Sequence, residues 1–438
     1  MEVAKQYSRR RRRNPSIDRL SDLPDSILCH ILSFLLTRNS VATSILSRRW
    51  RYLWSFVPNL DFDLEVESTA IDRVLLLHKL QKIDTFRITE GYGYTDCQIE
   101  TWIRFAVERN VKNLDLHFGY EGWVPPSPKC LLTCKTLVDL RLTNCTVFPV
   151  TGVVCLPSLK MLHLQFYHAY ETLPHLLSGC PVLENLLLQL YFNYCSCRIS
   201  SPTIKSLRIN FHYDECDNED EGEDIYDRLE IDTPALVYLE LIDSSNQHIK
   251  CGPLTSLLGA DINFHNYIDR GFLHSRALVE FIDRLHNIQF LKLDLSHYSE
   301  EIAHAAFPAQ TTAFRNLIEL ELTADCLLLW KFLENADNLE ILIFSECCEE
   351  LQGRAKPPLP APRCILSRLR MIKIVKIKGK RHEFGYIKYL LRNAKVLKRM
   401  KITYSEHLDS QKMINMLKKI SLFRRGSRAC KVAFVGDR

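Results

Sequence analysis

The sequence predicts an α/β fold built mainly as a solenoid of strand-plus-helix units, with a small helical domain before it and a basic α/β unit after it. A recurring apolar-x-x-apolar-x-apolar pattern beyond residue 80 predicts the solenoid. Short helical patterns within residues 17–63 predict the helical domain. A shift in charge marks the last unit, because residues 363–438 carry 22 Lys and Arg against 4 Asp and Glu.

Length and composition describe a folded chain with more than one architectural unit. The 438 residues are 46% hydrophobic with 15 Gly and 18 Pro, which excludes a wholly disordered or collagen-like chain. The sequence contains no run of about 18 apolar residues, so no membrane-spanning helix is predicted. Residues 27–36 are too short for a span and lack a secretory cleavage site. We therefore expect no membrane partner, reduced cysteines, and a location in the nucleus or the cytoplasm.

Charge is distributed unevenly along the chain. The net charge is +5, but residues 1–13 carry +5 and residues 363–438 carry +18, which leaves −18 on residues 14–362. An anionic partner or charge matching within the chain would both account for this contrast. Residues 1–16 are predicted to form a basic disordered tail, because the arginines of Arg9–Arg13 repel one another. A nuclear import signal and a nonspecific anion-binding tail both fit that tail.

Residues 17–57 are predicted to form three short helices within the domain of residues 17–63. Pro24 suits the first turn of a helix, and the apolar residues from 27 to 35 then recur at helical spacing. Ser47 is placed to cap a third helix that contains Trp50 and Trp54. So small a bundle lacks the core to bury all of its large apolar side chains, so we expect an exposed apolar surface for a partner.

The body of the chain repeats one strand pattern at a regular interval. Its first apolar positions are Ile83, Val111, Leu137, Leu159, Leu183, Ile204, Leu236, Leu257, Ile288, Leu317, Leu339, Leu369 and Leu397. Successive starts are 21 to 32 residues apart, which brackets the leucine-rich-repeat period of about 20–29 residues. Helix-like segments such as Glu171–Leu177 and Leu327–Asn335 lie between strands. Residues 80–350 are therefore predicted to form leucine-rich repeats.

The residue between the last two apolar positions of each strand is predicted to point away from the core. A mixed-charge set on this face suits binding of a protein target. The predicted contacts are Arg141, His163, Arg208, Glu240, Lys292 and Glu321. A solvated strand face with no ligand would have the same composition.

Sequence patterns for catalysis, metals and cofactors are missing. No phosphate loop, H-E-x-x-H or G-x-S-x-G is present, and we expect no catalytic residue and no cofactor. Cys195 and Cys197 with His212 and Cys216 are the nearest approach to zinc-ligand spacing, and buried thiols explain them better. The acidic segment Asp214–Asp224 fails as a calcium loop, since Arg228 occupies the position of the bidentate Glu.

A rival prediction is an adaptor-independent module that binds protein or nucleic acid through the basic C-terminal unit. Lysines cluster between Lys373 and Lys380, with Tyr386 and Tyr389 nearby. Cations interleaved with aromatic rings suit phosphate contacts and base stacking. Alternate lysines also fit the solvent face of a strand, so nucleic acid is the less favoured partner.

Three segments together resemble one protein family. The segment from Asp22 to Trp54, which begins DLPDSIL and ends LSRRWRYLW, resembles an F-box, and Leu60–Asp63 continues it. The segment LSGCPVLENL from Leu177 resembles the leucine-rich repeats of the same family. Residues 351–438, with LRNAKVLKRM from Leu391, resemble an FBD domain. The chain is identified as a member of the plant F-box/FBD/leucine-rich-repeat family.

The resemblance implies a non-catalytic substrate-recognition subunit of an SCF-type cullin–RING E3 ubiquitin ligase. The F-box would dock a Skp-type adaptor, and the repeats with the FBD domain would hold an unidentified target protein. The adaptor contacts implied are Leu23, Pro24, Ile27, Ile31, Trp50 and Trp54.

Overall fold

The computed structural model describes residue 20 and residues 22–63, 66–89, 94–118, 130–144, 152–166, 172–192, 197–213, 228–243, 248–264, 272–296, 313–346, 356–404 and 410–436. The predicted basic tail of residues 1–16 and the acidic segment Asp214–Asp224 lie outside these residues. The chain divides into two compact units, Met1–Asp115 and Leu116–Arg438. The first therefore contains the predicted F-box, the first predicted repeat strand and the start of the second.

The first unit begins with four short helical segments. They are the α-helices α1 (Asp25–Leu32) and α2 (Thr37–Ala42) and the 3-10 helices η1 (Thr43–Ile45) and η2 (Trp50–Phe56). The predicted third helix is thus a 3-10 helix. Its N-cap residue is Arg49, not the predicted Ser47, whose hydroxyl accepts from the Trp50 amide at 3.4 Å in the turn before the helix. Leu28, Leu32, Trp50, Leu53 and Val57 form the core of this bundle.

Strand–helix units follow directly in the same compact unit. They contain β1 (Asn59–Phe62), α3 (Ser68–Leu77), β2 (Thr85–Thr89), α4 (Asp96–Glu108) and the start of β3 (Asn113–His117). The Thr37 hydroxyl accepts from the Asp61 amide at 2.7 Å, which ties α2 to β1. Strands β1 and β2 pair in parallel. The small helical bundle is therefore stabilised by packing against the strands that follow it.

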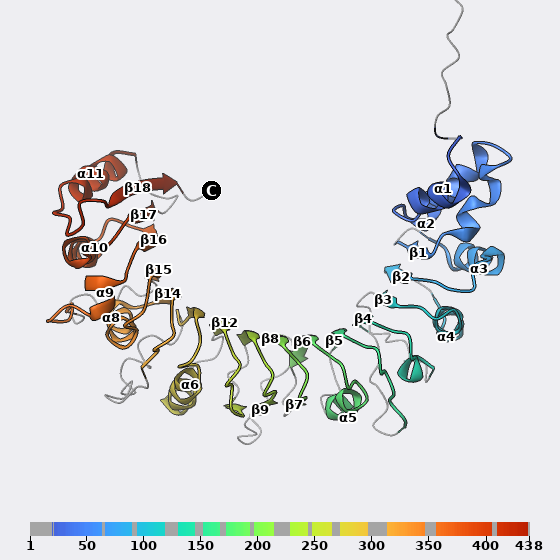
Figure 1. Ribbon diagram of the computed structural model, residues 1–438, viewed down its shortest axis with the longest axis horizontal. Coiled ribbons are helices and arrows are strands. Elements are labelled where there is room, and N and C mark those ends of the chain that lie inside the picture. Colours follow the sequence, from blue (N-terminus) through green and yellow to red (C-terminus); the bar gives the residue numbers. More distant parts are fainter. Residues whose placement is uncertain are drawn as a thin grey trace, which may run out of the picture. The chain divides into compact units, whose positions relative to one another are not determined.

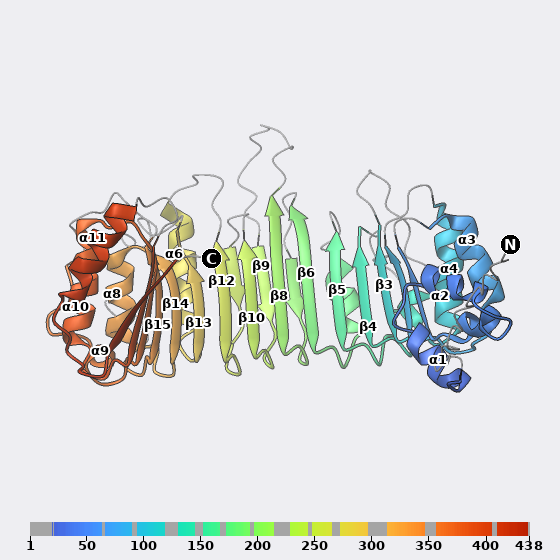
Figure 2. The same cartoon turned by 90° about the horizontal axis from the view of Figure 1, so that it is seen from above.

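The second unit is built on parallel strands, each paired with the strand of a neighbouring repeat (Figure 2). In spatial order they are β4 (Asp139–Thr143), β5 (Met161–Phe166), β6 (Asn185–Phe192), β8 (Ser206–Tyr213), β10 (Tyr238–Asp243), β12 (Gly259–Phe264), β13 (Phe290–Asp294), β14 (Glu319–Ala324), β15 (Ile341–Glu346), β16 (Met371–Ile377), β17 (Arg399–Tyr404) and β18 (Lys431–Gly436). Together with β2 and β3, the strands from β4 to β17 confirm every predicted repeat strand, each beginning two residues after the first apolar position.

The first apolar residue of each repeat lies in the turn that leads into the strand. Leu159, for example, is fully buried, and its amide donates to the Leu156 carbonyl at 3.2 Å. The next two amides, of Lys160 and Met161, both donate to the Val138 carbonyl of the preceding repeat, at 2.9 and 3.0 Å. The same paired contact recurs at later repeats, so the turns as well as the strands join successive units.

Helices cover one side of these strands (Figure 1). They are η3 (Leu131–Thr133), α5 (Leu173–Ser178), α6 (Phe272–Arg284), α8 (Cys326–Asn335), α9 (Arg363–Ser367), α10 (Arg381–Asn393) and α11 (Ser410–Ser421). In the middle repeats the covering layer is instead a small sheet in the order β11-β9-β7, formed by β7 (Cys197–Ser200), β9 (Arg228–Asp232) and β11 (His248–Cys251). These short strands were not predicted from the sequence, since four or five alternating residues carry little periodic signal.

Candidate functional site

The predicted adaptor contacts divide between the surface and the core of the first unit. Ile27 and Ile31 lie four residues apart on α1 and are 44% and 38% exposed. Pro24 is exposed and Leu23 is half-buried against the bundle core. Trp50 and Trp54 are only 3% and 7% exposed. The structure therefore places these two indoles inside the fold, where they support the surface without lining it.

Further large apolar side chains are exposed in the same region. Phe34 is 76% exposed, Ile45 86% and Leu46 62%. With Ile27 and Ile31 they make up what we call the apolar docking set. Phe34, Ile45 and Leu46 were not among the adaptor contacts expected from the sequence. Helical periodicity identifies an apolar stripe but not which of its members a small core leaves exposed.

Arg49 fixes the start of α1 beside η2. Its guanidinium donates to the Asp25 carboxylate, with Nε and Nη2 at 2.9 and 2.6 Å from Oδ1, and also to the Leu23 carbonyl. The Ser40 hydroxyl in turn donates to the Leu32 carbonyl at 2.9 Å, which closes the other end of α1 against α2. These contacts hold the helix that carries Ile27 and Ile31 in one orientation.

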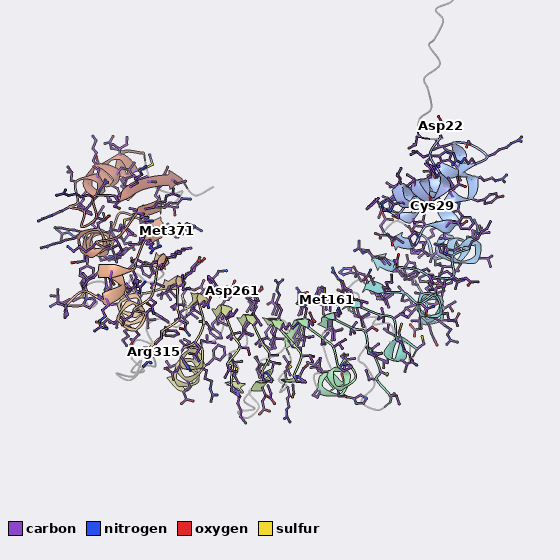
Figure 3. All side chains as sticks on the ribbon, viewed as in Figure 1. Asp22, Cys29, Met161, Asp261, Arg315 and Met371 are labelled. Carbon is purple, nitrogen blue, oxygen red and sulfur yellow. The ribbon has the colours of Figure 1, made fainter. Side chains whose placement is uncertain are left out.

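The predicted target contacts lie in one row across the strands of the second unit. Parallel pairing aligns the row in the order Arg141, His163, Leu187, Arg208, Glu240, Asp261, Lys292 and Glu321. The apolar neighbours in each strand are buried, as Leu140 and Leu142 show with 0% and 3% exposure. In Figure 3, Met161 and Asp261 lie on the strand side of the unit, away from its helices. All six predicted residues thus share one face.

Opposite charges pair with one another along this row. Arg208 Nε lies 3.3 Å from Glu240 Oε2, and Lys292 Nζ lies 2.9 Å from Asp261 Oδ2. The hydrogen bond to Asp261 is the main reason why the pKa of Lys292 is raised. Arg141 pairs with Asp139 of its own strand at 3.0 Å. Asp261 was missed from the sequence because its repeat, at Leu257, is degenerate.

The aromatic residues of the rival nucleic-acid prediction are committed to internal packing. Tyr386 is 3% exposed and packs edge-on against Phe344, with ring centroids 5.6 Å apart. Tyr389 packs against Trp330 at 5.2 Å, and its hydroxyl donates to the Pro358 carbonyl at 2.7 Å. Neither ring is presented for base stacking, so the stacking part of that prediction does not hold.

A Cys, Glu and His cluster lies where β15 meets α8 and α10. The Cys326 thiol donates to Glu346 Oε1 at 3.4 Å, and His382 Nε2 lies 3.0 Å from Glu346 Oε2. Burial raises the pKa of the Cys326 thiol and also that of Glu346. A nucleophilic cysteine needs a lowered pKa, so this cluster has the electrostatics of a structural hydrogen-bond network.

The described ranges contain no candidate metal cluster and no candidate membrane-spanning helix. There, His, Cys, Asp and Glu side chains form no group of three or more that could hold a metal ion. Cys197 is buried in β7, whereas Cys195 and Cys216 lie outside these ranges. No described helix is both long enough and apolar enough to cross a bilayer.

Comparison with protein-family models defines the class of protein. Residues 20–61 match the F-box domain, residues 356–402 match FBD, and residues 99–246 match the LRR repeats of the FBD-associated F-box protein At5g56370. The chain is therefore an F-box protein with leucine-rich repeats and a C-terminal FBD domain.

Full-length relatives extend these matches to nearly the whole chain. The F-box/LRR-repeat protein At4g14103 of Arabidopsis thaliana is 35% identical over 75% of this chain and 92% of its own. The F-box/FBD/LRR-repeat proteins At5g56420 and At2g26030 of Arabidopsis thaliana are 30% and 29% identical, each over 95% of this chain and 99% of their own. The chain belongs to the F-box/FBD/leucine-rich-repeat family.

Proposed function

We propose that the protein is the substrate-recognition subunit of an SCF-type cullin–RING E3 ubiquitin ligase. In this role the apolar docking set binds a Skp-type adaptor, and the strand face of the repeats and FBD domain binds a target protein. The observation that carries the proposal is the exposure of Ile27, Ile31, Phe34, Ile45 and Leu46 within the F-box match. Exposed apolar clusters of this kind belong to interfaces.

Such a subunit positions its target protein relative to the ligase and supplies no catalytic group. A target held on the same scaffold as the ligase has an effective concentration near the millimolar range when the link is short and flexible. Paired strands restrict the motion of a bound target more than a flexible link would, and thereby favour a subset of its lysines. This role needs no catalytic residue or cofactor.

Adaptor retention by the full chain tests the proposal. Ile27→Glu/Ile31→Glu places charge on the exposed side of α1 while leaving the buried Leu28 and Leu32 in place. We expect this variant to lose a purified Skp-type adaptor. Leu76→Glu/Leu77→Glu is the matched control, since these residues of α3 are 83% and 56% exposed outside the F-box match.

The two variants together decide the outcome. Retention by wild type and the control, with loss in the α1 variant, supports the adaptor-binding role. No retention by folded wild type, or equal loss in both variants, contradicts it.

We further propose that the protein acts in the nucleus or the cytoplasm, with Arg9–Arg13 directing nuclear import. A fluorescent fusion in which these arginines are replaced by Ala should leave the nucleus. If the fusion protein kept the same distribution between nucleus and cytoplasm, Arg9–Arg13 would not direct nuclear import.

A further inference from the structure

The strand face at the C-terminal end of the second unit is basic, since the described strands β16, β17 and β18 contain no acidic residue. Lys373 on β16 lies in register with Lys401 on β17, and Arg399 on β17 lies in register with Lys431 on β18. We call these four residues the basic strand face. Met371, which is in register with Arg399 and two residues before Lys373, lies on the strand side, away from α10, in Figure 3.

Adjacent strands in a sheet are about 4.8 Å apart, so cations in register are close neighbours. Like charges directly opposite each other destabilise a sheet. Arg399 and Lys431 are exposed, whereas Lys373 and Lys401 are half-buried. Among the described residues, none of the four cations forms an ion pair with an acidic side chain. Their repulsion is therefore left uncompensated within this part of the fold.

Lys373 and Lys401 continue the row of target contacts described above, and charges in that row pair with one another in earlier strands. Arg208 and Lys292 each have an acidic partner one strand away, Glu240 and Asp261. On the turn edge, Arg370 pairs with Glu340 at 3.6 Å. Cross-strand ion pairs thus join β8 to β10 and β12 to β13, whereas β15 places the uncharged Ile343 in the row.

No acidic residue occurs in the sequences of β16, β17 or β18. The acids nearest in the row belong to β14, where Glu321 is separated from Lys373 by the Ile343 position of β15. The break in pairing therefore concentrates positive charge at one end of a face whose other members neutralise each other.

We propose that the basic strand face binds an acidic, Asp- and Glu-rich segment of the target protein. The inference rests on the proposed function, because it specifies the chemistry of the target that the subunit recognises. Carboxylates complement cations on an open strand face, and side chains spaced across parallel strands can each meet one acid of an extended segment. Nucleic acid is less suited, because the nearby Tyr386 and Tyr389 are occupied in internal packing.

The test uses the full chain and a fluorescent peptide of alternating Glu and Ser, with a Gln-for-Glu peptide as reference. We expect the acidic peptide alone to bind, more weakly as salt rises. Lys373→Gln/Lys401→Gln should weaken binding about tenfold, the effect of removing two ion pairs. Lys388→Gln/Lys395→Gln removes the same charge from exposed positions on and just after α10, and should leave binding unchanged.

Adaptor retention is measured on the same preparations, so the two proposals fail separately. Loss of peptide binding with intact adaptor retention in the Lys373/Lys401 variant supports the inference. Absence of peptide binding by wild type, or equal loss in both lysine variants, overturns it. Tighter binding of single-stranded RNA or anionic lipid vesicles through Lys373 and Lys401 would also overturn it, in favour of that ligand.

Discussion

The Arg49 guanidinium joins η2 to the first turn of α1 by donating to the Asp25 carboxylate at 2.6 Å and to the Leu23 carbonyl. The pair is solvent-exposed, with side-chain exposures of 38% and 64%. Exposed pairs of this kind contribute less than about 1 kcal/mol, and the backbone contact adds a similar amount. Arg49 therefore orients α1 more than it stabilises the whole unit.

Arg49→Ala should lower the local stability of α1 by roughly 1 kcal/mol. Hydrogen exchange of the α1 amides measures this directly, and the amides of α4 in the same unit serve as an internal reference. Unchanged exchange in α1 would show that the bundle core alone holds the helix.

Trp50 and Phe34 should separate stability from adaptor binding. Trp50→Ala empties a 3%-exposed core position and should cost about 3–5 kcal/mol in a urea denaturation of the first unit. Phe34→Ala alters a 76%-exposed side chain and should change stability by less than about 0.5 kcal/mol. Adaptor retention should nevertheless fall in the Phe34 variant. A stable Trp50 variant would contradict its placement in the core.

His78 is predicted to make the stability of the first unit sensitive to acid. Its Nε2 lies 2.9 Å from the Val57 carbonyl, so Nε2 carries a proton and donates to this oxygen. Burial is the main reason why the pKa of His78 is lowered from 6.5. The unfolded chain therefore takes up a proton first as the pH falls below about 6.5.

Stability should consequently be complete above pH ~6.5 and decline below it, by up to about 1.4 kcal/mol per pH unit until the folded-state pKa is reached. His78→Gln keeps a donor for the Val57 carbonyl without titrating. Melting temperatures of the two proteins between neutral and mildly acidic pH should diverge, with the variant less sensitive. Parallel curves would exclude His78 as the cause.

The cross-strand charges predict opposite effects of one substitution at two positions. Lys292→Glu places a carboxylate between Asp261 and Glu321 and should destabilise the second unit by about 1–2 kcal/mol. Lys373→Glu places one between Ile343 and Lys401 and should be neutral or stabilising. Urea midpoints of the two variants measure the difference. Equal destabilisation would mean that strand position, not charge, determines the effect.

The repeat period was enough to predict the strands because each repeat uses the same apolar spacing to fill the same core. Leu137, Leu140 and Leu142 are 0%, 0% and 3% exposed, and their counterparts follow the same rule. The alternation of side chains along a strand then placed Arg141 and its equivalents on the opposite face. Local periodicity carried all of this information.

Only the structure shows which side chains of different repeats pair with each other. The sequence separates Arg208 from Glu240 by 32 positions and Lys292 from Asp261 by 31, so only the strand register reveals that they pair. The same register places no acidic residue beside Lys373 or Lys401 on the adjacent described strands. The sequence likewise did not decide that Trp50 is buried and Phe34 exposed, because helical spacing does not show which apolar residues of a stripe face the core.

By itself the sequence determined the repeated strands, the short N-terminal helices and the family, since these follow from local spacing and ordered motifs. Tertiary structure decided which apolar side chains of the F-box remain outside its core and which cations of the strand face have an acidic residue in register on an adjacent described strand. Both depend on contacts between residues distant in the chain, where packing volume and strand register, not local pattern, set the outcome.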